Sequence, residues 1–285
     1  MEHSPRPAAE WLGQRYAGLL DFLVPRLRQT AERNLAFAYP EKDSTWRRLT
    51  IHGVYASIGR LLVAVARLPG IGRENVNEWI RYEGFENYER AKARGKGVLF
   101  ATAHLGNWEL SAFAHALLTE PMNVVVRPLD NPLIDEMVEA RRAMSGNKLL
   151  SKRDFARSIL QALRGNEPVG ILVDQNTAAD NGVFVPFFGK PACTNLTFAK
   201  LAARSGAAVI PGFAIWSEAE RKYVLRFYPE VEISGDAETD TARVQAAIEL
   251  AIRENPEQWL WIHRRWKTRP PGEATLYGDI RRPSR

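Results

Sequence analysis

The residues best suited to chemistry are a histidine and a glutamate in one short stretch, His104-Leu-Gly-Asn-Trp-Glu109. A carboxylate that accepts the proton of one imidazole nitrogen leaves the other nitrogen free to act as a base. On a continuous helix this spacing would turn the two side chains roughly 140° apart. Gly106 and Asn107 favour a turn, in which they can converge. Alternatively, His104 is only a loop residue whose hydrogen bonds are made locally, and Glu109 only places a favourable negative charge at a helix N-terminus.

Short apolar runs and helical segments alternate from about residue 96 onward. This alternation predicts an α/β fold with a mostly parallel central sheet flanked by helices. Functional residues of such sheets gather where strands end, and His104 follows the first strand. We expect strands at residues 98–102, 124–126, 169–173, 207–215 and 223–231, and helices at residues 109–118, 133–144, 154–164, 194–205 and 241–254.

Two apolar helices precede this alternating region. Residues 51–65 carry a continuous apolar stripe, and the pattern at residues 11–23 ends at Pro25. Both fit helices that cover a core. The first also fits a helix in a bilayer interface, with Trp11 and Tyr16 at that depth and basic side chains toward anionic lipid, namely Arg15, Arg26 and Arg28. We expect residues 1–95 to form an N-terminal helical, membrane-facing region and residues 96–285 an α/β catalytic core, integrated as one domain.

Composition narrows the classes of protein. A chain of 285 residues that is 45% hydrophobic can bury a sizeable core. A net charge of +6 suits lipid head groups, an acidic carrier protein or nucleic acid without choosing among them. The N-terminus has no signal-peptide pattern, and no run reaches about 18 uninterrupted apolar residues. We therefore expect a chain that does not span a membrane by an ordinary helix, whereas these patterns leave attachment to a membrane surface open.

Several other chemistries lack their motifs. The sequence contains no Gly-x-Ser-x-Gly, no Gly-x-Gly-x-x-Gly after a strand, no Walker loop and no paired Cys/His spacing. We accordingly expect neither a cofactor nor a metal. The single cysteine, Cys193, excludes an intramolecular disulfide framework. It has no neighbouring histidine and is interpreted as a core residue at a helix entry, not as a nucleophile.

The His-x4-Glu stretch resembles the motif of the glycerolipid acyltransferase superfamily. Further blocks, in the right order, narrow the resemblance to the late, lauroyl/myristoyl-type acyltransferases of lipid A biosynthesis. It covers roughly residues 30 to 270 and includes Asn34-Leu35 with Pro40-Glu41 near the N-terminus. The other blocks are Arg127-Pro-Leu-Asp-Asn-Pro-Leu-Ile-Asp135, Arg142, Val173-Asp174-Gln175, the expected loop Val183-Phe-Val-Pro-Phe-Phe188 and residues 256–270.

The resemblance implies acyl transfer from a thioester to a hydroxyl, with His104 as base and Glu109 as the carboxylate that orients it. Asp174 would be a second acidic group, holding His104 or the acceptor, unless it only caps a turn. An arginine can hold a thioester oxygen or a phosphate through two hydrogen bonds. The residues expected to bind substrate or the oxyanion are Arg142, Asp174, Arg127, Asn107 and Gln175.

The resemblance also implies partners and a location. The donor would be an acyl group on acyl carrier protein, and the acceptor a Kdo-bearing lipid A precursor. The site of action would be the cytoplasmic face of the bacterial inner membrane, with peripheral or monotopic attachment and no nucleic acid. One alternative is an acyl-CoA-dependent acyltransferase of another lipid, such as a phosphatidylinositol mannoside or an aminolipid. The other is a non-catalytic protein that binds lipid or acyl carrier.

Two aromatic segments leave alternatives open. Trp261 and Trp266 alternate with basic residues, a pattern typical of nucleic-acid stacking, although the resemblance favours lipid phosphates or an acidic carrier. The basic residues are Arg264, Arg265, Lys267 and Arg269. Phe184, Phe187 and Phe188 either line an acyl tunnel or pack in the core.

Overall fold

The computed structural model of the chain describes residues 1–128, 131–150, 155–278 and 280. The α-helices are α1 (Arg6–Leu23), α2 (Pro25–Ala38), α3 (Ser44–Arg67), α4 (Phe85–Lys92), α5 (Trp108–Leu118), α6 (Pro132–Ala143), α7 (Phe155–Arg164), α8 (Thr197–Ser205) and α9 (Ala237–Glu254). Short 3₁₀ turns are η1 (Leu68–Gly70), η2 (Val76–Glu78), η3 (Ala179–Asn181) and η4 (Pro256–Gln258).

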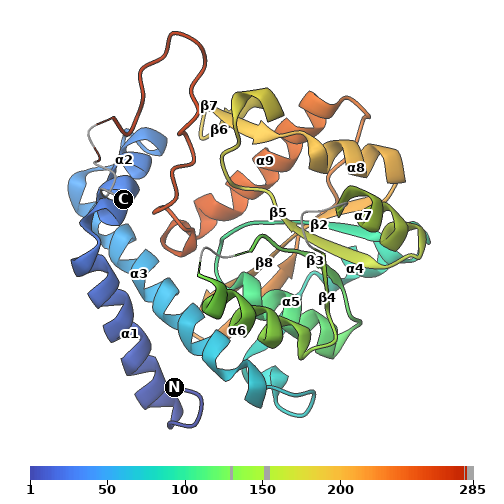
Figure 1. Ribbon diagram of the computed structural model, residues 1–285, viewed down its shortest axis with the longest axis horizontal. Coiled ribbons are helices and arrows are strands. Elements are labelled where there is room, and N and C mark those ends of the chain that lie inside the picture. The colour runs from blue at the N-terminus through green and yellow to red at the C-terminus, as the bar shows by residue number, and fades with distance from the viewer. Residues whose placement is uncertain (129–130, 151–154, 279, 281–285) are drawn as a thin grey trace.

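Seven of the described strands form one sheet in the order β1-β9-β8-β2-β5-β3-β4. Every neighbouring pair is parallel except β8 with β9. The prediction of a mostly parallel sheet between helices is therefore confirmed (Figure 1). The strands are β1 (Ile80–Glu83), β2 (Val98–Thr102), β3 (Asn123–Val125), β4 (Lys148–Leu150), β5 (Pro168–Leu172), β8 (Ala208–Ser217) and β9 (Lys222–Phe227), with β6 (Gly182–Phe187) and β7 (Lys190–Asn195) as a separate antiparallel hairpin.

The two faces of the sheet bury two hydrophobic cores. Side chains alternate along a strand, so Leu99 and Ala101 of β2 point to one face and Val98 and Phe100 to the other. Leu99 and Ala101 pack with residues of α7, α8 and α9 and with the C-terminal tryptophans. Val98 and Phe100 pack with residues of α4 and α5. Both faces are covered, as a parallel sheet requires.

The N-terminal helices form a layer along one side of the molecule (Figure 1). Helix α1 turns its small residues inward, with Ala9, Gly13 and Ala17 buried. A Cβ atom added to Gly13 would lie 2.6 Å from the carbonyl oxygen of Gly59 on α3. Only glycine permits this approach of the two helices, and the large apolar side chains of α1 consequently face outward.

Helix α3 confirms the apolar stripe predicted for residues 51–65. The segment Ser44–Gly70 is also long and apolar enough to cross a membrane, judged by length and mean hydropathy. The expectation from uninterrupted apolar runs missed this because mean hydropathy tolerates scattered polar residues. Of its most apolar window, 44% is buried inside the protein. Core helices of soluble proteins share this property, so hydropathy alone does not make α3 a membrane span.

The β6–β7 hairpin corrects two local expectations. Phe188 and Gly189 have φ angles of 54° and 67°. Positive φ at both central residues makes the two-residue turn that joins antiparallel strands. Residues 183–187, expected in a loop, are therefore strand, and α8 begins only at Thr197. Cys193 lies in β7 and not at a helix entry, and its side chain is fully buried.

Other boundaries moved by a few residues. Strand β9 ends at Phe227, before Pro229, and α9 begins earlier than expected, at Ala237. Asp154, the expected first residue of α7, and residues 129–130 of the expected block after Arg127 lie outside the described residues. Strands β1 and β4 and helix α4 were not predicted, because each is short and β1 and α4 contain several polar residues.

Candidate active site

The pairing of β2 with β5 brings a histidine and an aspartate together. Thr102 is in register with Leu172, and His104 and Asp174 each follow two residues later. The distance between His104 Nδ1 and Asp174 Oδ1 is 2.8 Å. The backbone N–H of His104 donates to Asp174 Oδ2 at 2.9 Å. Parallel neighbours thus present both side chains at the carboxyl edge of the sheet, where α/β proteins place their sites.

Asp174 is held as a buried anion. Its side chain is 2% exposed, and its Oδ2 accepts a further hydrogen bond from the Trp259 indole N–H at 2.8 Å. Burial would raise the pKa of this carboxyl, but the charge and hydrogen bonds of His104, with the Trp259 N–H, hold the pKa well below its ordinary value. The carboxylate therefore stays ionised at any pH at which the protein works.

This carboxylate fixes the tautomer of His104. Because an ionised carboxylate only accepts hydrogen bonds, Nδ1 carries the proton and Nε2 presents its lone pair. The Gln175 amide nitrogen lies 3.3 Å from Nε2 and donates to it. Burial lowers the pKa of the imidazole, but the charge and hydrogen bond of Asp174, with the charge of Glu109, raise the pKa overall. The arrangement makes His104 a base whose free nitrogen faces a hydrogen-bond donor.

Glu109 has a different contact from the one expected. Its Oε2 and Oε1 accept hydrogen bonds from Arg142 Nε and Nη2 at 2.8 and 2.6 Å. The two side chains are only 11% and 18% exposed. The contact to Nδ1 that was expected from Glu109 is made by Asp174, so the assignment of Glu109 as orienting carboxylate is corrected. Glu109 instead fixes the guanidinium of Arg142 beside the imidazole.

The loop between His104 and α5 is tightly fixed. Gly106 has a φ of 65°, and a Cβ atom there would lie 2.0 Å from the carbonyl oxygen of Ala214. Glycine is therefore required at this position. Asn107 is fully buried, and its Oδ1 accepts the N–H of Leu110 at 3.0 Å, which caps α5. Asn107 was expected to bind substrate or the oxyanion, and its observed contact is this cap.

The segment that follows α9 is hydrogen-bonded to the loop that carries His104. Gly106 N donates to Gln258 O at 2.9 Å, and Leu260 N donates to His104 O at 3.0 Å. Together with the bond from Trp259 to Asp174, these contacts tie the segment to the loop that carries His104. Trp259 was not predicted as a site residue. The only signal for it was its place in the block at residues 256–270.

The same segment was expected to present a basic and aromatic surface. Trp261, Trp266 and Arg265 are instead fully buried. Arg265 donates to Cys193 O, Thr194 Oγ1 and Gln245 Oε1. Buried rings cannot stack on bases, and a buried guanidinium cannot meet lipid phosphate. The pattern at these three positions is structural, because these side chains pack inside the protein and not on its surface.

An apolar cavity of about 820 Å³ opens beside His104. Pockets that bind small ligands typically fall at about 300–1,000 Å³. The cavity lies between α3, α5, α6 and one face of the sheet, and Glu109, Arg142 and Gln175 line it with His104. Arg127 lines it too and is exposed. The described residues contain no cluster of three or more His, Cys, Asp or Glu placed to hold a metal ion.

The aromatic residues of β6 and of the turn that follows it do not line the cavity beside His104. Phe187 and Phe188 are buried in the core with Trp259 and Trp261, and neither lines the cavity beside His104. Of the two alternatives for these rings, core packing is the one observed. Phe184 lines a separate hollow of about 850 Å³ along α9. That hollow is not lined by His104, Asp174 or Glu109.

Comparison with known proteins shows which family the sequence matches. The sequence matches the family described as bacterial lipid A biosynthesis acyltransferase over residues 1–268. It is 33% identical to the lipid A biosynthesis palmitoleoyltransferase of Escherichia coli K12, over 96% of this chain and 89% of that protein. It is 30% identical to the lauroyltransferase of the same organism, over 96% and 90%. Identity to the myristoyltransferase is 24%, over 92% and 81%.

Proposed function

This chain belongs to the bacterial lipid A biosynthesis acyltransferase family, and we propose that it transfers a fatty acyl group from acyl carrier protein to a hydroxyl of a lipid A precursor. Membership makes it an O-acyltransferase. The observation that carries the proposed mechanism is the contact of His104 Nδ1 with the buried Asp174, which leaves Nε2 at an apolar cavity of about 820 Å³. The cavity takes the acyl chain, and the base meets the acceptor.

The reaction proceeds by direct attack. The acceptor hydroxyl replaces the Gln175 amide as the donor to His104 Nε2 and gives up its proton there. Its oxygen attacks the thioester carbonyl carbon, and Asp174 stabilises the imidazolium that forms. The carbon–sulfur bond then breaks, and the thiolate takes the proton back from the imidazolium. An ester and a free thiol result, with no covalent enzyme intermediate, and the buried Cys193 takes no part.

Arg142 stabilises the negative charge on the carbonyl oxygen in this proposal. Two of its three guanidinium nitrogens are engaged by Glu109, which leaves Nη1 for the oxyanion. A guanidinium held in a nearly dry site is oriented before reaction and needs no reorganisation. Arg127, exposed at the cavity, binds a phosphate of the acceptor. In this proposal His104 is the base, Arg142 binds the oxyanion and Glu109 holds Arg142 in position.

We further propose that residues 1–95 dock the enzyme on the cytoplasmic face of the inner membrane. Helix α1 supports this because its large apolar residues are exposed, with Phe22 at 80% and Leu23 at 62%. Leu133 and Ile134 of α6, beside the cavity, are also exposed. A soluble protein rarely leaves such a surface in water, whereas Trp11 and Tyr16 on the same helix suit a bilayer interface. Arg28, the third arginine expected to meet lipid, pairs with Asp21.

The test of the reaction compares donors and variants. Purified protein is incubated with a Kdo-bearing lipid A precursor and with acyl groups on either acyl carrier protein or CoA, and products are followed by mass spectrometry. We expect one acyl group to be added, faster from the carrier protein, and His104→Ala to remove the product. Equal transfer by His104→Ala would refute the mechanism. A faster rate from CoA would favour the alternative donor.

The test of membrane docking is flotation with vesicles of phosphatidylethanolamine and phosphatidylglycerol. Phe22→Ser with Leu23→Ser should reduce the floated fraction. The control, Leu250→Ser, alters another exposed leucine, 53% exposed on α9, and should float like the wild type. Equal flotation of the double variant would contradict docking through α1.

A further inference from the structure

The cavity beside His104 has an open end and a closed end. At the open end the lining residues Leu62, Ile134 and Met137 are 39 to 47% exposed. At the other end Phe100 and Met122 are only 6% and 5% exposed. His104 follows Phe100 by four positions, roughly 13 Å at about 3.3 Å per residue along a strand. The buried part of the cavity therefore lies against the face of the sheet, at residues of β2, β3, β5, β8 and β9.

A glycine and a methionine meet at the closed end. Gly170 of β5 is in register with Phe100 of β2 on one side and with Val124 of β3 on the other. It leaves a bare position between two side chains that line the cavity. A Cβ atom added to Gly170 would lie 2.8 Å from Met122 Cε. The end of the Met122 side chain thus already occupies the space that a larger residue at position 170 would take.

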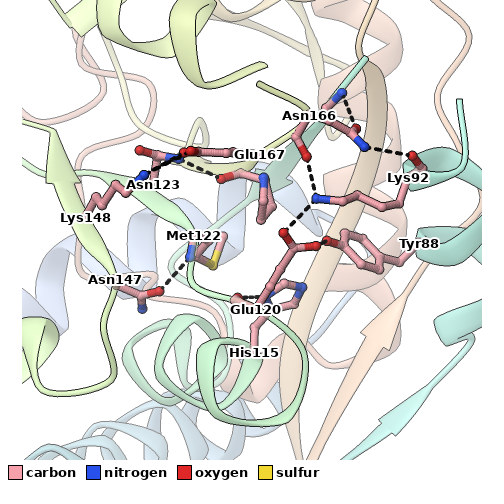
Figure 2. Close-up of polar contacts among 12 residues, drawn as sticks. Tyr88, Lys92, His115, Glu120, Met122, Asn123, Asn147, Lys148, Asn166 and Glu167 are labelled. Atoms are coloured by element: carbon pink, nitrogen blue, oxygen red, sulfur yellow. Dashed lines mark hydrogen bonds and ion pairs between the residues drawn. The ribbon is translucent and has the colours of Figure 1, made fainter. Parts of the chain in front are cut away.

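The backbone of Met122 cannot move freely. Its N–H donates to Asn147 Oδ1 at 2.9 Å, and its carbonyl oxygen accepts the N–H of Lys148 at 3.0 Å (Figure 2). Asn147 is itself tied to α5 by a hydrogen bond to the carbonyl oxygen of Ala112. Only the flexible thioether of Met122 can therefore adapt to what fills the cavity.

Polar contacts surround Met122 and block any extension of the cavity past it (Figure 2). Two residues before it, Glu120 accepts from Tyr88 at 2.6 Å and pairs with Lys92 at 2.7 Å. One residue after it, Asn123 donates to Glu167 at 2.7 Å. A hydrocarbon chain that passed Met122 would have to separate these groups without replacing their hydrogen bonds, which is unfavourable.

We propose that Met122, seated against Gly170, is the stop that sets the longest acyl chain the enzyme transfers. This inference rests on the proposed function, because it assigns the cavity to the acyl chain. Shortening the side chain at position 122 lengthens the cavity by the space of the thioether. Adding a methyl group at position 170 pushes Met122 Cε toward the chain, since the other directions hold buried polar contacts, and shortens the cavity.

The experiment measures kcat/KM for a ladder of saturated acyl groups on acyl carrier protein, each differing by two carbons. Met122→Ala should move the optimum to a longer chain and Gly170→Ala to a shorter one. A single misfitting methylene in an apolar pocket changes kcat/KM by about 10- to 200-fold. Met137→Ala, a methionine at the open end of the same cavity, is the matched control and should leave the optimum length unchanged. General loss of stability cannot shift the optimum in opposite directions.

The double variant Met122→Ala with Gly170→Ala should return the optimum toward the wild-type length, because the added methyl group then occupies space that Met122 has left. Met122→Val, whose apolar side chain is intermediate in size between methionine and alanine, should show a smaller lengthening and replaces Met122→Ala if that variant does not fold. An unchanged optimum in these variants while transfer continues would overturn the stop and leave the proposed function standing.

A binding measurement separates the two proposals. Thermal stabilisation by a ladder of free saturated fatty acids reports the depth of the cavity without catalysis. If wild-type protein transferred no acyl group at all, the proposed function would fail. The fatty-acid lengths preferred by Met122→Ala and Gly170→Ala would still decide whether Met122 ends the cavity, with opposite shifts supporting the stop and equal lengths refuting it.

Discussion

Replacing Asp174 by asparagine removes one charge and keeps the shape of the side chain. In the wild type Oδ2 accepts the N–H groups of His104 and Trp259, and Oδ1 faces His104 Nδ1. The oxygen of asparagine can keep the first two bonds, which places its NH₂ group against Nδ1. Two donors cannot face each other, so the imidazole proton moves to Nε2. The nitrogen that should accept the hydroxyl proton is then blocked.

The size of the effect follows from the loss of general-base catalysis. Such a base contributes about 10²–10⁴-fold to the rate. This corresponds to a barrier increase of about 2.7–5.4 kcal/mol, at 1.36 kcal/mol for each tenfold. We therefore expect Asp174→Asn to lower kcat by that factor while leaving the fold intact, since the two hydrogen bonds to Oδ2 survive.

The pH profile gives an independent readout. In the wild type Asp174 raises the pKa of His104, so activity should rise with pH through a value above the ordinary one for histidine. Removing the anion disfavours the imidazolium and lowers that pKa. The acid limb of the kcat/KM profile should therefore move to lower pH even though the plateau falls.

The assay is acyl transfer followed by mass spectrometry, with circular dichroism as the check of folding. A folded Asp174→Asn variant with wild-type kcat and an unmoved acid limb would refute the assignment of Asp174 as the residue that orients His104. Rate loss without any movement of the limb would show that the carboxylate acts on the structure alone.

Three further predictions concern coupling, cysteine chemistry and acid stability. Glu109→Ala leaves the largely buried guanidinium of Arg142 unpaired and should lower the free energy of unfolding by about 3 kcal/mol. Adding Arg142→Ala should recover part of this loss, as measured by urea unfolding. Strictly additive losses in the double variant would contradict the coupling of the two residues. Cys193→Ala should keep most transfer activity, because the thiol is buried in β7; a folded but inactive variant would sink the direct mechanism. Burial lowers the pKa of His115 and of His263 to about 4. The unfolded chain therefore binds their protons first, and stability should fall as pH drops from about 6.5 to about 4, by up to about 3 kcal/mol for each group; His115→Phe should flatten this slope in urea unfolding measured across that range, and an unchanged slope would contradict it.

The elements that carry the site were predictable because their sequences are strongly apolar. β2 and β5 are runs of small and branched apolar residues, and each is followed by a polar residue, His104 or Asp174. Local spacing offered Glu109 as the partner of His104 because only five positions separate them. The actual contact depends on which strands are neighbours, and strand order is decided by packing across 70 positions of sequence.

The C-terminal segment shows a second limit. Trp261, Arg265 and Trp266 lie in irregular backbone, which has no period of two or 3.6 residues from which an inner face can be inferred. Their mixture of charge and aromatic rings looks like a surface. Burial of Arg265 is possible only because backbone and side-chain oxygens of β7 and α9 surround it, and these come from distant parts of the chain. For helix α1 the pattern fitted both a helix that covers the core and a helix in a bilayer interface, and in the structure its Trp11 and Tyr16 are exposed.

The bond from Trp259 to Asp174 has a consequence for the order of events during translation. Ribosomes add about 5–20 residues each second, and the N-terminal part of a chain emerges first. Helix α1, which we propose to meet the bilayer, is therefore made well before the indole that completes the buried carboxylate. A growing chain can reach its membrane while its imidazole still lacks an oriented partner. The newly synthesised enzyme would then begin to cleave thioesters only after its synthesis is complete, when it is already at the membrane that holds its lipid substrate.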